Sequence, residues 1–225
     1  MLRTLLLFFA RQRWLRRFME ISAFAKPLTR RFVAGETLAE GIALSRQLSA
    51  AGYLVSLDHL GENVSTEEEA SASAEAIHHA LDSLRDAGLG ATVSIKLTQF
   101  GLDLSRELCL RNVEPLVAKA KAMGTRVEID MESTAYTART IEIIGELHEK
   151  YGAVRAVIQA YLHRSEADIR SMNQLGVPVR LCKGAYQEPA ELALIDKGEV
   201  DATYLKLAKL LLDEGHYPAI ASQTG

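Results

Sequence analysis

Short apolar segments alternate with longer helical patterns along most of the chain, and this alternation occurs six times. The segments are rich in Val, Ile and Leu, and Gly88, Gly124 and Gly152 mark the ends of helical patterns between them. Such alternation predicts β–α units and a parallel sheet whose strands are buried on both faces. The predicted strands are residues 53–58, 92–97, 126–130, 154–159, 179–182 and 217–221.

The segments between the strands have the spacing of amphipathic helices. Thr37 is a suitable N-cap for the first helix. Glu67, Glu68 and Glu69 fall in the first turn of the second helix, where acidic side chains interact favourably with the helix dipole. The predicted helices are residues 37–51, 65–88, 105–123, 134–150 and 165–175, with a last helical stretch that ends at 214.

The pattern fits a (β/α)8 barrel of the TIM type better than other α/β folds. No Gly-x-Gly-x-x-Gly sequence follows the first strand and no Gly-Lys-Ser/Thr sequence occurs, which disfavours Rossmann and P-loop folds. A closed barrel needs eight units, so we expect an incomplete barrel of about six βα units with N-terminal helices. The expected division is a basic amphipathic helical segment over 1–36 and a partial barrel over 37–225.

The first residues combine an apolar run at 5–9 with Arg11, Arg13, Arg16 and Arg17. This run is too short for a transmembrane helix, which needs about 20 apolar residues. The arginines also separate it from a small-residue cleavage site of the kind that ends a signal peptide. The segment predicts an amphipathic helix, which either covers one end of the domain or makes a peripheral membrane contact.

The formal net charge of −3 and the absence of a basic stripe with aromatic residues argue against nucleic-acid binding. Cys109 and Cys182 are far apart and lack a metal-type spacing, so we expect both to be reduced and buried, which favours a cytoplasmic protein. His59 and His163 follow predicted strands, but no His-x-His pair supports a metal site, and none is predicted.

Five of the six predicted strands end at or near a polar or charged residue. Because α/β barrels carry their chemistry at the carboxyl ends of the strands, these residues are expected to share one site. A lysine in an apolar strand is unfavourable to bury without a partner or a function; the alternative is a side chain that reaches solvent. The residues are Asp58, Lys96, Asp130, Gln159 and Arg180.

Glu128, Asp130 and Glu132 alternate along the third strand and its exit, which predicts three acids on one side. Such a set could bind a metal, act as a base or pair with cations. The alternative is a cluster that caps the next helix.

The segment Val-Arg-Leu-Cys-Lys-Gly-Ala-Tyr at 179–186 places Arg180 and Lys183 beside the backbone of Gly184 and Ala185. This combination suits an anion such as a phosphate, a carboxylate or a flavin ring that gains negative charge on reduction. Ion pairing with the acids after the third strand is an alternative. Gln159 has an amide that can donate to and accept from a heterocycle edge.

Four ordered motifs on successive strands resemble those of the proline dehydrogenase family. They are S-I-K-L-T-Q-F-G-L-D at 94–103, V-E-I-D-M-E at 127–132, V-I-Q-A-Y-L-H-R at 157–164 and V-R-L-C-K-G-A-Y-Q-E-P at 179–189. Residues 30–38 and 57–62 agree with the same family, so the resemblance covers about 28–221.

The resemblance implies a (β/α)8 enzyme that holds FAD non-covalently, oxidises L-proline to Δ1-pyrroline-5-carboxylate and passes electrons to a quinone-type acceptor. It implies Asp130 and Arg180 as the catalytic pair, with Lys96 and Tyr186 on the substrate side. Ser222 and Gln223 stand where the family has a threonine and a histidine that hold FAD. The residues implied to contact FAD are Met131, Gln159, Lys183, Gly184, Ala185, Ser222 and Gln223.

The family's seventh and eighth strands, with an arginine pair for the proline carboxylate, have no counterpart up to residue 225. The expectation is therefore a C-terminally truncated member of the family. One alternative is a truncated or split, non-catalytic product that needs a partner. Another is a Schiff-base lyase that uses Lys96 or Lys183.

Overall fold

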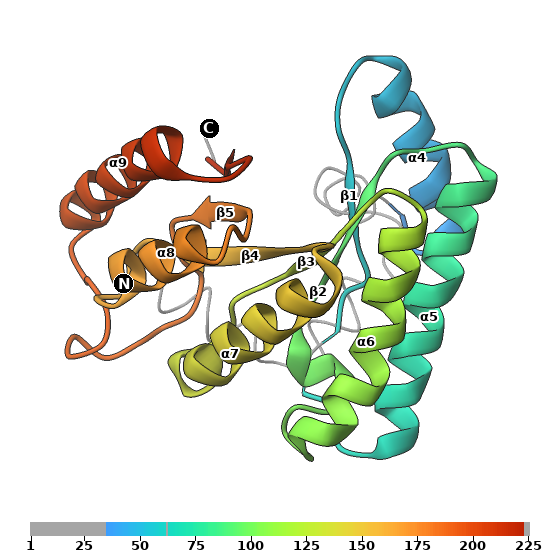
Figure 1. Cartoon of the computed structure of the whole chain (residues 1–225), viewed down its shortest axis with the longest axis horizontal. Coiled ribbons are helices and arrows are strands. Elements are labelled where there is room, and N and C mark those ends of the chain that lie inside the picture. Colours follow the sequence, from blue (N-terminus) through green and yellow to red (C-terminus); the bar gives the residue numbers. More distant parts are fainter. Residues whose placement is uncertain (1–34, 62, 223–225) are drawn as a thin grey trace, which may run out of the picture.

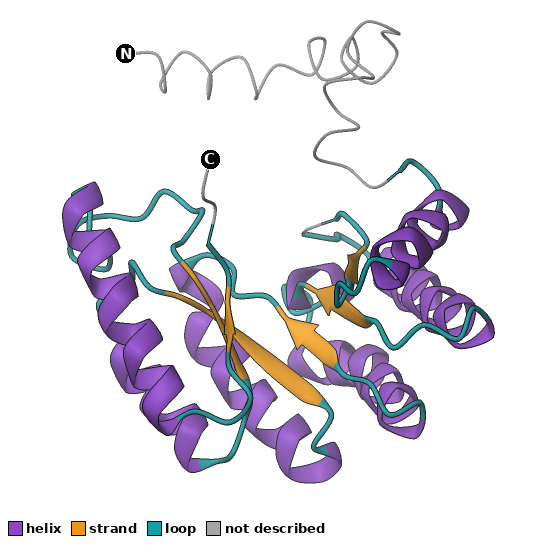
Figure 2. Ribbon diagram, turned by 90° about the horizontal axis from the view of Figure 1, so that it is seen from above, coloured by secondary structure: helices purple, strands orange, loops and turns teal. Residues whose placement is uncertain are grey.

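The computed structural model describes residues 35–61 and 63–222, and these residues form one curved parallel sheet with helices along its outer side (Figures 1 and 2). The amphipathic helix expected within 1–36 lies almost entirely outside the described residues. The strands are β1 (Ser56–Asp58), β2 (Thr92–Ile95), β3 (Val127–Ile129), β4 (Val154–Gln159), β5 (Val179–Cys182) and β6 (Ala219–Ile220).

Helices follow the strands in regular alternation, as the sequence predicts. Thr37 caps the first described helix in a capping box with Glu40, and Thr66 caps the next. The helices are α4 (Leu38–Ala50), α5 (Glu67–Asp86), α6 (Arg106–Ala122), α7 (Thr134–Tyr151), α8 (Ser165–Gln174) and α9 (Lys197–Glu214), with a short 3-10 helix η1 (Leu97–Phe100).

Each strand pairs in parallel with the next strand along the chain, in the order β1-β2-β3-β4-β5-β6. The register places Ser94 opposite Glu128 and Val157 opposite Arg180. A sheet wound in one direction with its helices on one side is the arrangement of a β/α barrel, whereas a Rossmann sheet reverses its strand order and carries helices on both faces. The prediction of an incomplete (β/α)8 barrel is confirmed: the described strands form a half-barrel.

The two faces of the sheet differ in polarity. The face toward the helices carries apolar side chains that belong to one buried core: Val93, Ile95, Val127, Ile129, Val154, Ile158, Val179 and Leu181. The inner face of β2 to β5 is mostly polar: Thr92, Ser94, Glu128, Arg155, Gln159 and Arg180. The core therefore holds the helices in place, while the polar side chains are left for the interior of the half-barrel.

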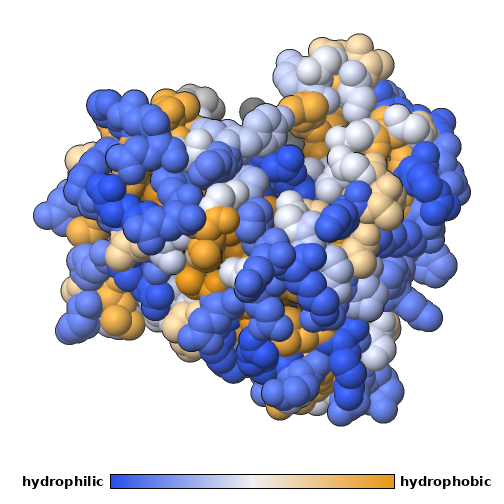
Figure 3. Space-filling view, viewed as in Figure 1, coloured by the Kyte–Doolittle hydropathy of each residue, from blue (hydrophilic) through white to orange (hydrophobic). Residues whose placement is uncertain are grey.

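Polar side chains also cover most of the helical surface seen in Figure 3, with apolar patches between them. None of the described helices is both long enough and apolar enough to cross a lipid bilayer. Among the described residues, no three His, Cys, Asp or Glu side chains are grouped so that they could hold a metal ion.

Three of the predicted strands differ from the structure by two or more residues at one end. The first strand begins at Ser56 instead of Tyr53, because pairing with β2 starts only where Thr92 N donates to Val55 O. The second strand ends at Ile95, and its predicted last residue, Leu97, begins η1 instead. The last predicted strand, 217–221, is reduced to two residues in β6.

The two cysteines have different surroundings. Cys109 is buried as predicted, and burial raises the pKa of its thiol to about 12. Cys182 was expected to be buried but is only half-buried, because it lies on the inner face of β5. Burial still raises the pKa of the Cys182 thiol to about 11. Both thiols are free.

Phe100 in η1 is fully buried, and η1 contacts both α5 and α6. We expect Phe100→Ala to lower the free energy of unfolding by about 3–5 kcal/mol, because it leaves a cavity between these elements. Chemical denaturation followed by circular dichroism measures this change. Tyr53→Ala is the matched control, since Tyr53 is 64% exposed and should change the same quantity by less than about 0.5 kcal/mol. Equal losses in the two variants would contradict the assignment of η1 to the core.

Candidate active site

The carboxyl ends of β2 to β6 surround an open pocket of about 650 Å³. Every site residue that the family resemblance implies lines this pocket, apart from Gln223, which lies outside the described residues. Asp58, which was expected at the same site, does not line it, and neither do Glu128 and Glu132. Val157, Cys182 and Ala221 also line it. The predicted residues that the fold brings together here are Lys96, Asp130, Met131, Gln159, Arg180, Lys183, Gly184, Ala185, Tyr186 and Ser222.

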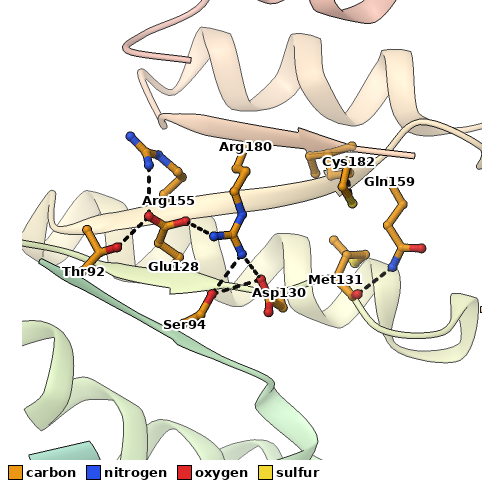
Figure 4. A network of polar contacts seen from close by, with 10 residues as sticks. Thr92, Ser94, Glu128, Asp130, Met131, Arg155, Gln159, Arg180 and Cys182 are labelled. Carbon is orange, nitrogen blue, oxygen red and sulfur yellow. Dashed lines mark hydrogen bonds and ion pairs between the residues drawn. The ribbon is translucent and has the colours of Figure 1, made fainter. Parts of the chain in front are cut away.

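Arg180 reaches from β5 across the inner face of the sheet and lies between two carboxylates (Figure 4). Its Nη2 is 2.5 Å from Asp130 Oδ1, and its Nη1 is 2.6 Å from Glu128 Oε2. Arg180 Nη2 also donates to Ser94 Oγ at 2.9 Å, and Ser94 donates in turn to Asp130 Oδ1 at 3.2 Å. Val157 is the residue opposite Arg180 in β4. The guanidinium group is therefore fixed by contacts from β2 and β3.

Glu128 is held in turn by a second set of contacts, on the side away from Asp130 (Figure 4). Its Oε1 accepts hydrogen bonds from Thr92 Oγ1 at 2.8 Å and from Arg155 Nη1 at 3.0 Å. Charges thus alternate along the chain of contacts Arg155, Glu128, Arg180 and Asp130. Glu128 is only 2% exposed, and a carboxylate buried to this degree needs such partners.

Burial raises the pKa of Asp130, although the neighbouring Arg180 and Lys96 act in the opposite direction. The carboxylate of Asp58, at the end of β1, adds to the increase. Asp130 therefore combines an ion pair with a proton affinity above that of an ordinary aspartate.

The expected column of three acids is wrong at Glu132. Its carboxylate accepts hydrogen bonds from Thr98 N at 3.1 Å and from Thr98 Oγ1 at 2.5 Å. Strand β3 ends at Ile129, so the alternation of sides along a strand no longer applies at Glu132. Glu132 thus stabilises η1, while Glu128 and Asp130 both face Arg180.

Gln159 uses its amide to join two loops at the rim of the pocket. Its Nε2 donates to Met131 O at 2.6 Å and to Glu132 O at 3.2 Å, and its Oε1 accepts from Ala185 N at 3.4 Å. The sequence suggested an amide that contacts a heterocycle. In the structure both ends of the amide contact the protein backbone.

The loop after β5 is packed closely against Tyr161. Gly184 has φ = 129°, and a Cβ atom at this position would lie 2.2 Å from the Tyr161 ring, so only glycine fits. Lys183 turns to α9, where its Nζ lies 2.6 Å from Asp201 Oδ1. Pairing with the acids of the third strand is therefore confirmed for Arg180 and wrong for Lys183.

Sequence reasoning missed Thr92, Ser94 and Arg155 as members of the polar network. A signal was present, because Thr92 and Ser94 alternate with Lys96 along one strand, and Arg155 alternates with Gln159 along another. The partner of Lys183 carried no such signal.

Comparisons with known proteins agree with this geometry. The family model for proline dehydrogenase matches residues 42–224. Proline dehydrogenase 1 of Bacillus subtilis is 37% identical over 223 residues, which is 99% of this chain and 73% of that protein. The proline dehydrogenase of Deinococcus radiodurans is 34% identical over 200 residues, or 87% of this chain and 64% of that protein.

A solved structure has the same fold over most of the chain. Proline utilization A (PutA) from Bdellovibrio bacteriovorus superposes with a TM-score of 0.79 and 26% identity, over 88% of this chain and 26% of that much longer one. The sequence matches and the common fold lead to one conclusion: the chain belongs to the proline dehydrogenase family.

Proposed function

We propose that this chain catalyses the FAD-dependent oxidation of L-proline to Δ1-pyrroline-5-carboxylate and passes the electrons to a quinone-type acceptor. The observation that carries the proposal is Arg180, held between two carboxylates in a pocket at the carboxyl ends of the strands. The names of the relatives support proline as the substrate. The Bdellovibrio PutA structure is of an enzyme inactivated by N-propargylglycine, a small amino acid.

The residues that line the pocket suit a flavin in their chemistry. Gly184 has no side chain and lies close to the Tyr161 ring, so it contributes only backbone to the pocket wall. Met131, Val157 and Ala185 add apolar surface for a planar ring, and Lys183 and Ser222 offer a cation and a hydroxyl group for phosphate oxygens. The chemistry that FAD supplies when bound is the acceptance of a hydride, that is, two electrons and one proton.

Arg180 and Asp130 are proposed as the catalytic pair. Oxidation of proline removes a hydride from a ring carbon and a proton from the ring nitrogen as the C=N bond forms. Negative charge then develops on the hydride acceptor, and a fixed guanidinium stabilises such charge without having to reorganise. The contacts of Arg180 with Glu128, Asp130 and Ser94 provide this preorganisation. Among the described residues that line the pocket, Asp130 alone carries a carboxyl group. It is therefore placed to receive the proton that leaves the ring nitrogen.

Lys96 and Tyr186 line the same pocket and are proposed to contact the substrate. The Schiff-base alternative requires a neutral lysine amine as nucleophile. Lys183 Nζ is engaged by Asp201 at 2.6 Å, which disfavours this role for Lys183. We place the enzyme in the cytoplasm, with a peripheral membrane contact through the basic segment 1–36 as the route to a quinone.

Replacing Arg180 tests the central role. In the full chain supplied with FAD, we expect Arg180→Met to lower kcat for proline-dependent dye reduction by about 100- to 1,000-fold, the usual effect of removing a donor at a site of developing charge. Arg180→Lys keeps the charge but loses the planar fork that spans Glu128 and Asp130, so it should restore only part of the rate.

Arg111→Met is the matched control for this experiment, because Arg111 is exposed and pairs only at the surface with Glu67. It should leave kcat within about twofold of the unchanged chain. If Arg180→Met also stays within about threefold, Arg180 does not act as proposed.

The raised pKa of Asp130 predicts two pH effects with a defined sign. Activity needs the ionised carboxylate beside Arg180, so kcat/KM should fall as the pH is lowered through a pKa above the ordinary 3.8. Stability should change in the opposite sense, because the folded state favours the protonated form. The free energy of unfolding of the unchanged chain relative to Asp130→Asn should therefore decrease as the pH rises above 3.8.

Steady-state kinetics and denaturation over the same pH range measure both effects. Asp130→Asn should lose the acidic limb of the kcat/KM profile along with most of its activity. An unchanged acidic limb in this variant would assign the titration to another group.

A further inference from the structure

Glu188 makes a contact between two segments that the sequence keeps far apart. It lies in the loop between β5 and α9, two residues after Tyr186, while Thr134 is the first residue of α7. The Glu188 carboxylate accepts hydrogen bonds from Thr134 N at 2.8 Å and from Thr134 Oγ1 at 2.6 Å. Each carboxylate oxygen thus has its own donor on one residue of α7.

Helix α7 lacks a cap from its own chain segment. Its N-cap residue, Ser133, makes no side-chain capping hydrogen bond, whereas Thr37, Thr66 and Ser105 cap α4, α5 and α6. The first N–H groups of a helix have no partner within the helix, and a negative charge is favoured beside them. Glu188 therefore supplies from another loop what Ser133 does not supply locally.

The two segments that meet in this contact each contribute a wall to the pocket. The first wall, residues 130–134, contains Asp130 and Met131, and the second, residues 184–188, contains Gly184 to Tyr186. Gln159 joins the same walls at a second point, through Met131 O and Ala185 N.

We infer that Glu188 is a positioning residue that holds the 184–188 wall at a fixed distance from the 130–134 wall. The Thr134–Glu188 contact shapes the pocket for a ligand and is more than a cap for α7. The statement that this contact affects the binding of FAD and proline rests on the proposed function. The statement that it holds the two walls together is independent of that function.

Four variants of the full chain separate these two roles. Glu188→Ala removes the contact, and Thr134→Val removes only the hydroxyl donor. Glu188→Ala combined with Ser133→Asp gives α7 a local acidic N-cap without restoring the link between the walls. Glu191→Ala is the matched control, because Glu191 is an exposed acid of the same loop and makes no side-chain hydrogen bond or ion pair with a described residue.

Two measurements are made on each variant. Hydrogen exchange, read by mass spectrometry on peptides that cover 183–190 and 134–140, reports on the loop and the start of α7 in the absence of FAD. Fluorescence titration with FAD gives the Kd for the cofactor.

In Glu188→Ala we expect exchange in 183–190 to become at least about tenfold faster and the Kd for FAD to rise at least about tenfold, because two hydrogen bonds to a charged group are lost. Thr134→Val should show a smaller change of the same kind, and Glu191→Ala should match the unchanged chain. Addition of Ser133→Asp should slow exchange at 134–140 again but leave 183–190 fast and the Kd high.

Unchanged exchange in 183–190 of Glu188→Ala would overturn the inference. So would full recovery of that exchange by Ser133→Asp, since it would reduce Glu188 to a helix cap. If the unchanged chain does not bind FAD, the proposed function fails, but the exchange data still decide whether Glu188 holds the two walls together.

Discussion

The ion pairs of Arg180 with Glu128 and Asp130 determine the interior of this half-barrel. A guanidinium on the inner face of a parallel sheet needs anionic partners, and β3 supplies two of them at alternate positions. Thr92 and Arg155 then satisfy Glu128, so the charges balance across four strands without a large apolar side chain in between. The pocket at the carboxyl ends of the strands is lined by both Arg180 and Asp130. Burial raises the pKa of Asp130, and the ion pair with Arg180 opposes this increase.

The two faces of the sheet differ in polarity, and this difference makes the polar interior compatible with folding. Apolar side chains on the outer face pack with the helices in one continuous core, and that burial stabilises the fold. The loops at the carboxyl ends are then tied to each other by Gln159 and by Glu188 with Thr134. A rigid scaffold with cross-linked loops is what a site needs if it has to present charges at fixed positions.

Sequence periodicity could predict the strands and the side of the sheet that Lys96, Asp130 and Arg180 share, because both follow from the two-residue repeat of a strand. It failed where that repeat ends. Glu132 lies beyond β3 and contacts Thr98 instead of Arg180. Similarly, η1 begins at Leu97, the last residue of a predicted strand. The partners of Lys183 and Glu188 could not be predicted either, since Asp201 and Thr134 meet them only through the packing of α9 and α7. Resemblance to a family named candidate residues, but not the contacts that hold them.

Anaerobic titration of the FAD-loaded full chain with L-proline tests the central claim most directly, that a fixed Arg180 and Asp130 form a proline-oxidising flavin site. The visible absorbance of the flavin should be bleached in proportion to the proline added, and Δ1-pyrroline-5-carboxylate should form in equal amount, with D-proline inactive as the control. A chain that retains bound FAD but shows no bleaching by excess L-proline would contradict the claim.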